Sequence, residues 1–539
     1  MFFGARGHRD GVFFLTGASV LCIISTLYLG LSFSGLRITN PNIHISETGI
    51  SSMGIATKSS DESVLDAIPE TILIAHAPGW TLFQNLYMSN GTLYIVASES
   101  RQAEIPPIRM MTSTGIEADT TPENIAMREP TPQEMQIITP QLARLKWGSS
   151  VEDGELNRIW TVEGITLLVN EPRQFLAHYY HFVAELLFGA WSFLYGAFNP
   201  YSQLSHTPSM ISANNSSSLA NQAQQEYNPP SFSRFIFMHA SSEGWRDSPG
   251  FNSYFVRAAF PSLSIEESDD WADRVAATSD KAMGPRSKDR AWHFPVVLLS
   301  DRSAAFRGEA CGQRTHRIAA ESWEAMVDSA GIDLSGRWWD SVRENILEFA
   351  GVAMHTRDGV GRVARISGAQ SLLSKPEQIT ITYLVRQGER RRLIQEDHDG
   401  LVQALKEMVE RKKAQDGQEW NLRIVEPETL SKDDQVDLAS KTTILLGVHG
   451  NGLTHLVLMK PNRWSSVIEI FYPGGFAHDY EWTARALGMR HYTIWNDTYL
   501  TYPNEPAVVY PEGFQGTDIP VHGKAVAKLI EDRLEDTLL

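Results

Sequence analysis

The sequence predicts an α/β protein with a parallel sheet, and three observations in its C-terminal third lead to this fold class. Short, β-branched apolar runs alternate strictly with segments of helical periodicity from residue 379 to residue 494. A glycine turn, His449-Gly450-Asn451-Gly452, follows one of these runs and opens a helical segment. A carboxylate, Glu469, lies in the next apolar run. Such alternation is typical of a parallel sheet with helices on both faces.

The elements of this C-terminal region follow in a regular order. Strands are expected at residues 379–385, 420–425, 443–448, 467–470 and 491–494, and helices at 393–412, 430–440, after Gly452 and at 477–487. Parallel sheets of this kind bind ligands at the carboxyl ends of their strands. Arg386, His449 and Glu469 lie at or near such ends, so one sheet should direct all three toward one crevice.

The region before this sheet is expected to form a separate domain, because 539 residues suffice for two or three hydrophobic cores. Strands are expected at residues 91–98, 159–169, 235–238 and 296–299, an apolar helix at 178–195 and further helices within 321–352. Residues 203–231 are rich in Ser, Asn and Gln, which indicates a surface insertion, and residues 266–292 are charged and loop-like.

The N-terminus contains a candidate membrane anchor. No charged residue occurs in residues 11–36, a span long enough to cross a bilayer with some tilt. Arg6 and Arg9 precede it, and this bias of positive charge places residues 1–10 in the cytosol. Residues 37–70 are polar and indicate a stem. A cleaved signal peptide is the alternative, although its apolar core is usually shorter.

Composition narrows the range of partners. The formal net charge of −17 argues against the basic stripe that a nucleic-acid-binding surface needs. Cys22 lies inside the candidate anchor and leaves Cys311 alone beyond it, so no intrachain disulfide can form there. We therefore expect no nucleic-acid partner and a globular region that depends on its core. Triplets for N-glycosylation occur at Asn90, Asn214, Asn215 and Asn496.

Two sets of residues are candidates for binding an anionic ligand. Glycines at 450 and 452 let the backbone amides from Gly450 to Leu453 approach a ligand closely, and a helix N-terminus favours an anion. Arg386 and Arg391 belong to a group of four arginines directly after a strand, and guanidinium groups bind phosphate through paired hydrogen bonds. A tight strand-to-helix turn and a solvated basic turn are the corresponding structural alternatives.

The apolar helix expected at 178–195 begins with candidate acid–base residues. His178, His181 and Glu185 are spaced so that they share one helix face. A carboxylate beside an imidazole can take a proton from a hydroxyl group. The same residues also suit satisfied polar groups at a helix start, or a His-x-x-His zinc site.

Asp397 and Asp399 form an Asp-x-Asp pattern that can hold a divalent cation on a nucleotide diphosphate. The pattern is short enough to arise by chance. It also lies at or before a helix start, where acidic residues are ordinary. Metal dependence therefore stays an open alternative.

With these residues identified, the chain resembles glycosyltransferase family 61, which includes plant β-1,2-xylosyltransferases, arabinosyltransferases and the EGF-domain O-linked N-acetylglucosamine transferases. The resemblance spans residues 170–495 and rests on His449-Gly450-Asn451-Gly452-Leu453-Thr454, Val467-Ile468-Glu469-Ile470, Tyr480 before Ala484 and Leu487-Gly488, Arg386 with Arg391-Arg392, and Tyr180-His181-Phe182 with Glu185. The chain departs from the family at Asn451, where many members have a small residue such as Ala, and in the insertion at 203–231.

The resemblance implies a GT-B-like architecture, in which two Rossmann-like domains face a cleft, in a type II membrane protein of the Golgi or endoplasmic reticulum. It implies an acceptor-side domain at 71–350, a nucleotide-sugar-binding domain at 351–500 and a C-terminal extension with a helix at 501–539. It also implies inverting transfer of a sugar, most simply xylose or N-acetylglucosamine, from a UDP-sugar to a glycan or glycoprotein acceptor.

The resemblance assigns roles to the candidate residues. His181 or Glu185 is expected to be the catalytic base. The donor is expected to contact Arg386, Arg391, His449, Gly450, Asn451, Gly452, Leu453 and Glu469. No cofactor is required, although a divalent cation on the diphosphate is possible.

Two other function classes stay open. A membrane-anchored protein that binds a sugar nucleotide or glycan without turnover would keep the same fold. A metal-dependent enzyme with a single Rossmann-like domain would be built around Asp397 and Asp399. Turnover of nucleotide sugars, measured with and without a chelator, separates these classes.

Overall fold

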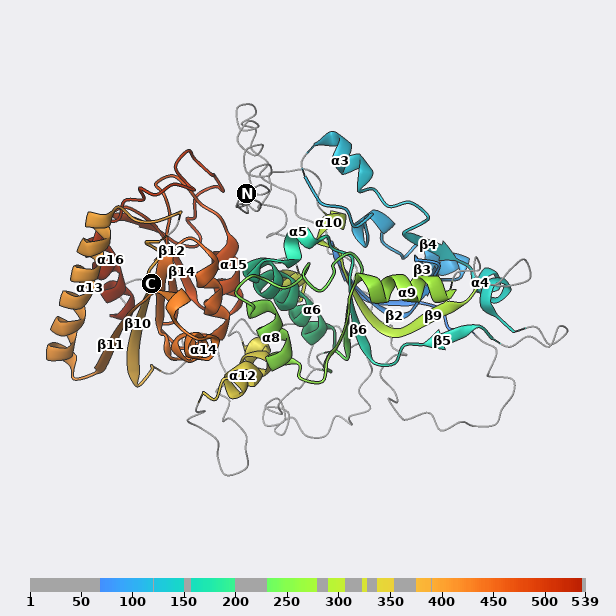
Figure 1. Cartoon of the computed structure of the whole chain (residues 1–539), viewed down its shortest axis with the longest axis horizontal. Coiled ribbons are helices and arrows are strands. Elements are labelled where there is room, and N and C mark those ends of the chain that lie inside the picture. Colours follow the sequence, from blue (N-terminus) through green and yellow to red (C-terminus); the bar gives the residue numbers. More distant parts are fainter. Residues whose placement is uncertain are drawn as a thin grey trace, which may run out of the picture.

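The computed structural model describes residues 68–119, 121–149, 157–198, 230–278, 289–305, 322–326, 337–352, 375–388 and 390–535. These residues form two α/β units side by side, one around a nine-stranded sheet and one around a six-stranded sheet (Figure 1). The candidate anchor, most of the candidate stem and insertion, Cys311, and the triplets at Asn214 and Asn215 lie outside the described residues.

The C-terminal unit contains the parallel sheet that the sequence predicts. Its strands are β10 (Gln378–Leu384), β11 (Glu419–Val425), β12 (Ile444–Val448), β13 (Ser466–Ile470), β14 (Arg490–Trp495) and β15 (Thr498–Leu500). The order is β11-β10-β12-β13-β14-β15, and every pair is parallel except β14 with the edge strand β15. Helices cover both faces, which explains the near-continuous apolar runs of the inner strands.

The helices of this unit also follow the predicted order. They are α13 (Gln395–Asp416), the 3₁₀ turn η7 (Pro427–Thr429), α14 (Lys432–Lys441), the 3₁₀ helix η8 (Asn451–Leu458), α15 (Asp479–Ala486) and α16 (Gly523–Leu534). The helix expected after the glycine turn is therefore present as a short 3₁₀ helix of 8 residues. Helix α16 packs on α13 and places Val526, Leu529 and Ile530 in the same core as the sheet.

The strand order reverses between β10 and β12. From β10 the chain moves to β11 on one side and through β12, β13 and β14 on the other. Such a switch point leaves a crevice between the carboxyl ends of two neighbouring strands. Arg386 follows β10 and the glycine turn follows β12, so both border this crevice.

The N-terminal sheet is mixed, which limits the expected second Rossmann-like domain to part of it. Its strands are β1 (Ile72–Ala77), β2 (Trp80–Ser89), β3 (Thr92–Val96), β4 (Met135–Ile138), β5 (Ile159–Thr161), β6 (Ile165–Val169), β7 (Arg234–Phe237), β8 (Ser264–Glu266) and β9 (Ala291–Ser300). The run β9-β6-β7-β8 is parallel, but β2 joins β9 in the antiparallel sense and forms antiparallel pairs with β1 and β3.

Two local expectations for this region were wrong. The strand expected at 159–169 is two strands, because Gly164 between them has a φ of +88° that a side chain would oppose. The stretch 266–292, expected as a loop, contains helix α9 and the start of β9. The helices of this unit are α2 (Glu99–Gln102), η2 (Ile108–Met110), α3 (Pro122–Met127), α4 (Pro140–Trp147), α5 (Arg173–Leu176), η3 (Tyr180–Leu187), α6 (Phe188–Phe198), α8 (Phe251–Ala259), α9 (Ser268–Thr278), α10 (Arg302–Ala305), η5 (Arg337–Trp339) and α12 (Asp340–Phe349).

The apolar helix predicted at 178–195 lies between the two sheets (Figure 1). It begins as the π-helix η3 and continues as α6, and nearly all of its side chains are buried. Within the described part of the chain, Tyr180–Phe198 is the one helical segment long and apolar enough to cross a membrane, and 83% of its apolar window is buried inside the protein. A helix that is apolar all round is expected in the interior of a large protein.

One hydrophobic core joins the two units. It includes Phe193 and Phe255 of the N-terminal unit together with Leu456 and Ala484 of the C-terminal unit. Two hydrogen bonds also join the units: Trp338 Nε1 donates to Ala486 O at 3.1 Å, and Trp339 Nε1 donates to Val457 O at 3.0 Å. A shared apolar core of this kind holds the two sheets in a fixed relation, unlike a polar interface between independent domains.

Candidate functional site

A pocket of about 300 Å³ lies at the switch point of the C-terminal sheet. Arg386 after β10 and the turn Gly450 to Leu453 after β12 line one side. Tyr179 and Phe251 come from the N-terminal unit and line the other. Ligand sites of open parallel sheets lie at this place in the fold. Of the predicted donor-binding residues, the pocket brings together Arg386 and Gly450 to Leu453, whereas His449, Arg391 and Glu469 do not line it.

The two glycines of the turn are required to different degrees. A Cβ on Gly450 would lie 1.9 Å from Arg386 Nη1, so this residue must be glycine for the guanidinium group to pack over the turn. A Cβ on Gly452 would meet only Leu384 Cδ1 at 3.4 Å, an ordinary contact. Gly452 also lacks a positive φ. The structure therefore gives a steric reason for glycine at position 450, whereas the close approach of a ligand to Gly452 stays a prediction.

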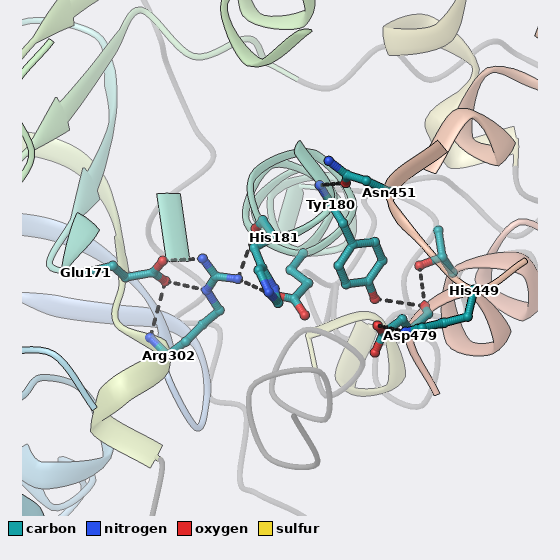
Figure 2. Close-up of polar contacts among 9 residues, drawn as sticks. Glu171, Tyr180, His181, Arg302, His449, Asn451 and Asp479 are labelled. Carbon is teal, nitrogen blue, oxygen red and sulfur yellow. Dashed lines mark hydrogen bonds and ion pairs between the residues drawn. The ribbon is translucent and has the colours of Figure 1, made fainter. Parts of the chain in front are cut away.

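Asn451 connects the turn to the helix between the sheets. Its Oδ1 accepts a hydrogen bond from the backbone N–H of Tyr180 at 3.0 Å, where the π-helix begins (Figure 2). Tyr480 supports the turn from the other side, since its hydroxyl donates to Gly450 O at 2.6 Å. The residue that departs from the family pattern thus satisfies an N–H at the start of η3, which a helix start otherwise leaves without a partner.

Arg391 is held close to the same place by an unusual backbone conformation. Its φ of +56° is rare for a residue with a side chain, and its N–H donates to Gly516 O at 2.6 Å. Burial, with a smaller contribution from Arg390 and Arg386, lowers the pKa of Arg391 to about 10. The group stays cationic at neutral pH, and an anion bound among these arginines would relieve their mutual repulsion.

His449 is oriented by a buried carboxylate. Its Nδ1 lies 2.5 Å from Glu469 Oε1, and its ring stacks on Phe471 with centroids 4.9 Å apart. Glu469 Oε2 accepts from His491 Nε2 at 2.7 Å. Burial raises the pKa of Glu469 well above its ordinary value, and the two imidazole donors stabilise its ionised form.

This arrangement gives Glu469 a different place from the one expected. The side chain is fully buried behind His449 and does not line the pocket. In this position Glu469 cannot contact a sugar nucleotide bound in the pocket directly. Glu469 instead fixes the ring orientation of His449, whose Nε2 faces Asp479 Oδ2 at 3.9 Å.

His181 and Glu185 form a second imidazole–carboxylate pair on the helix between the sheets, and neither side chain lines the pocket. His181 Nδ1 lies 2.9 Å from Glu185 Oε2 in the first turns of the π-helix. Glu185 is fully buried, and its Oε2 also accepts from Arg302 Nη1 at 2.5 Å. Arg302 in turn pairs with the buried carboxylate of Glu171, so a chain of charges leads to the imidazole (Figure 2). Of the two candidate bases, His181 is the one that keeps some solvent exposure, at 26% of its side chain.

His178 lies beside this pair and is neutral at physiological pH. Burial lowers its pKa to about 3, and the neighbouring His181 contributes in the same direction. The His178 and His181 rings are 4.8 Å apart between centroids. Among the described residues no group of three His, Cys, Asp or Glu side chains is placed to hold a metal ion. The arrangement thus favours an acid–base role for His181 over the His-x-x-His zinc alternative.

Asp479 is a site residue that the sequence reasoning missed. Its backbone carbonyl accepts from Tyr180 Oη at 2.8 Å, and its carboxylate faces His449. Its negative charge raises the pKa of His178, in the N-terminal unit, and the pKa of Arg391, in the C-terminal unit. Its one sequence signal is that it is an acidic residue at the start of helix α15. Acidic residues are common at helix starts, so this signal does not single it out.

The Asp-x-Asp pattern lies away from the pocket. Asp397 Oδ2 accepts from the backbone N–H of Val521 at 3.0 Å, and Asp399 Oδ1 accepts from Gln395 Nε2 at 3.0 Å. Both residues lie in the first turns of α13, and neither lines the pocket. Their observed contacts are structural.

Comparisons with known proteins agree with the family inferred from the motifs. Residues 341–468 match the family model of glycosyltransferase 61, and this segment contains nearly all of α12, β10 to β12 and the glycine turn. The chain is 34% identical over 141 residues to the EGF domain-specific O-linked N-acetylglucosamine transferase of Drosophila melanogaster. The alignment covers 26% of this chain and spans about a quarter, 24%, of that relative. The segment at residues 341–468 is therefore similar to glycosyltransferase family 61, the family that the motifs indicate.

Proposed function

We propose that this protein is an inverting glycosyltransferase that moves a sugar from a UDP-sugar to a glycan or glycoprotein acceptor. The observation that carries the proposal is the pocket at the switch point, which is lined by Arg386 and the glycine turn. Asn451 of this turn is hydrogen-bonded to Tyr180 of the helix that carries the His181–Glu185 pair. A cationic crevice next to an oriented base is what transfer from a nucleotide sugar requires.

The geometry supports a division of roles. His181 Nε2 takes the proton of the acceptor hydroxyl, because its Nδ1 is turned toward Glu185. The acceptor oxygen then forms a bond to the anomeric carbon while the bond between that carbon and the diphosphate oxygen breaks, which inverts the configuration. Negative charge grows on the departing UDP, where Arg386, Arg391 and the turn amides stabilise it. Glu185 orients His181 and stabilises its protonated form.

The donor sugar is proposed as N-acetylglucosamine, with xylose as the alternative within the same family. The relative from Drosophila melanogaster is named as an O-linked N-acetylglucosamine transferase specific for EGF domains. That name supports a protein-linked acceptor, although the match covers only the segment around the nucleotide pocket. The proposed setting is the Golgi or endoplasmic reticulum membrane, and the uncharged span at 11–36 supports a type II anchor.

The architecture is proposed as a variant of GT-B. Two α/β units on either side of the site support that description. The mixed N-terminal sheet and the core shared between the units distinguish it from two independent Rossmann-like domains around an open hinge. The donor pocket accordingly has walls from both units, and donor affinity should depend on residues of both.

The proposal is tested by transfer and hydrolysis assays with a panel of nucleotide sugars, with and without a chelator. Arg386→Ala should lower kcat/KM by about 30- to 1,000-fold, because a charge-assisted contact in a dry site is worth about 2–4 kcal/mol. Arg392→Ala is the matched control, since Arg392 belongs to the same arginine group but is exposed and does not line the pocket. Binding of a nucleotide sugar without any turnover would instead identify a binding protein.

A further inference from the structure

The pocket has an acidic end that the proposed chemistry does not use. Glu428 lines the pocket in the turn η7, directly after strand β11. Its side chain is exposed, and no hydrogen bond or ion pair is recorded for it among the residues that the structure describes. The carboxylate therefore faces the pocket with its acceptor capacity unused by the protein.

The turn that carries this carboxylate is fixed by a chain of hydrogen bonds. Gln435 Nε2 donates to Pro427 O at 2.8 Å and to Leu430 O at 3.2 Å, on either side of the turn. Gln435 Oε1 accepts from His455 Nε2 at 2.8 Å. His455 Nδ1 then accepts from the hydroxyl of Tyr179 at 3.1 Å.

The direction of this chain follows from the state of His455. The ring is fully buried, and burial lowers its pKa to about 4, so it is neutral and has one donor nitrogen and one acceptor nitrogen. Because Gln435 turns its carbonyl oxygen toward the ring, Nε2 carries the proton. The Tyr179 hydroxyl donates its hydrogen bond to His455 within the protein, so Tyr179 presents mainly its ring to a ligand. The pocket wall is thus fixed before a ligand binds.

The two ends of the pocket differ in charge. Strands β11, β10 and β12 are neighbours, so the turn with Glu428, then Arg386, then Gly450 follow one another along the edge of the sheet. Neighbouring strands lie about 4.8 Å apart. A phosphate is favoured beside Arg386 and disfavoured beside a carboxylate, whereas a carboxylate accepts hydrogen bonds from neutral hydroxyl groups.

We propose that Glu428 binds the ribose hydroxyls of the donor nucleotide and makes the pocket selective for ribonucleotides. This inference rests on the proposed function. The diphosphate lies beside Arg386 and Gly450, and the nucleoside extends toward β11 with its ring face against Tyr179 and Phe251. An acid at the end of the strand next to the phosphate-binding strand has the same role in other sheets of this kind. Glu469, the acid that the sequence pointed to, is buried elsewhere.

The test is calorimetry on the purified full-length protein with UDP, 2′-deoxy-UDP and 3′-deoxy-UDP. Wild-type protein should bind UDP about 10- to 100-fold more tightly than at least one deoxy analogue, as expected for a hydrogen bond to a charged group. Glu428→Ala should weaken UDP binding by the same factor and leave the deoxy analogue nearly unchanged, so that the discrimination disappears. Glu426→Ala is the control, because Glu426 is exposed two residues away and does not line the pocket.

Each outcome decides the proposal. Wild-type protein that binds UDP without discriminating against either deoxy analogue overturns the ribose assignment and leaves the proposed function standing. Discrimination that survives in Glu428→Ala overturns it as well. Wild-type protein that binds no nucleoside diphosphate at all overturns the proposed function together with this inference. A normal melting temperature of Glu428→Ala, expected for an exposed side chain, rules out unfolding as the cause of a loss.

Discussion

Glu185→Gln should separate the positioning role of the carboxylate from its part in the fold. The substitution keeps the size of the side chain and an acceptor oxygen for His181 Nδ1, but it removes the negative charge. In the native protein Arg302 lies between two fully buried carboxylates, Glu171 and Glu185. The change therefore leaves Arg302 with one ionised partner, as a neutral buried pair.

The expected loss of stability is moderate for this reason. Weakening one hydrogen bond to a charged group costs about 1.5–3 kcal/mol, and no charge is left without a partner. Arg302→Met is the contrasting variant, because it leaves Glu171 and Glu185 buried without their cation. It should cost about 3–5 kcal/mol or more of unfolding free energy. Urea denaturation of both variants measures the difference.

The loss of turnover in Glu185→Gln should be large, in contrast to its moderate loss of stability. A base that loses the carboxylate that stabilises its protonated form should lower kcat by about 10²- to 10⁴-fold in Glu185→Gln. UDP affinity should stay within a few-fold, because neither Glu185 nor His181 lines the donor pocket. A folded Glu185→Gln protein with near-native kcat would refute the reasoning, and the base would have to be sought elsewhere.

Three further predictions concern the turn, acid stability and topology. Gly450→Ala should reduce UDP affinity at least tenfold by displacing Arg386, whereas Gly452→Ala should change it little, since its Cβ meets only an ordinary contact; equal effects in calorimetry would contradict the assigned packing. His455 and His491 are buried with pKa values lowered from 6.5 to about 4, so the unfolded chain binds more protons in this window and the free energy of unfolding should fall as the pH drops from 6.5 to 4; denaturation midpoints that are flat over this range would contradict it. The uncharged N-terminal span predicts that the rest of the chain is protected from external protease in sealed microsomes, and digestion there would exclude a type II orientation.

The amino-acid sequence determined the C-terminal sheet almost completely. Each strand of a parallel sheet covered on both faces is a short apolar run, and each connection is a helix with its own periodicity. The signal is therefore local, and it also places Arg386, His449 and Gly450 at the strand ends where ligands bind. The matching family model covers this part of the chain. The motif around His181 and Glu185 was equally visible, because both lie within two turns of one helix.

The N-terminal sheet and the partners of the site residues were decided by the tertiary structure. Strand β2 pairs with β9, so Trp80 lies opposite Ser300, and no local pattern records a pairing over that separation. The same holds for Glu469, whose burial behind His449 depends on where β14 brings His491. Tyr179 meets the pocket only because the helix between the sheets packs against the C-terminal unit. Local periodicity indicates which face of an element is buried. Only tertiary packing decides which side chains of distant elements come into contact, and the site of this protein consists of such contacts.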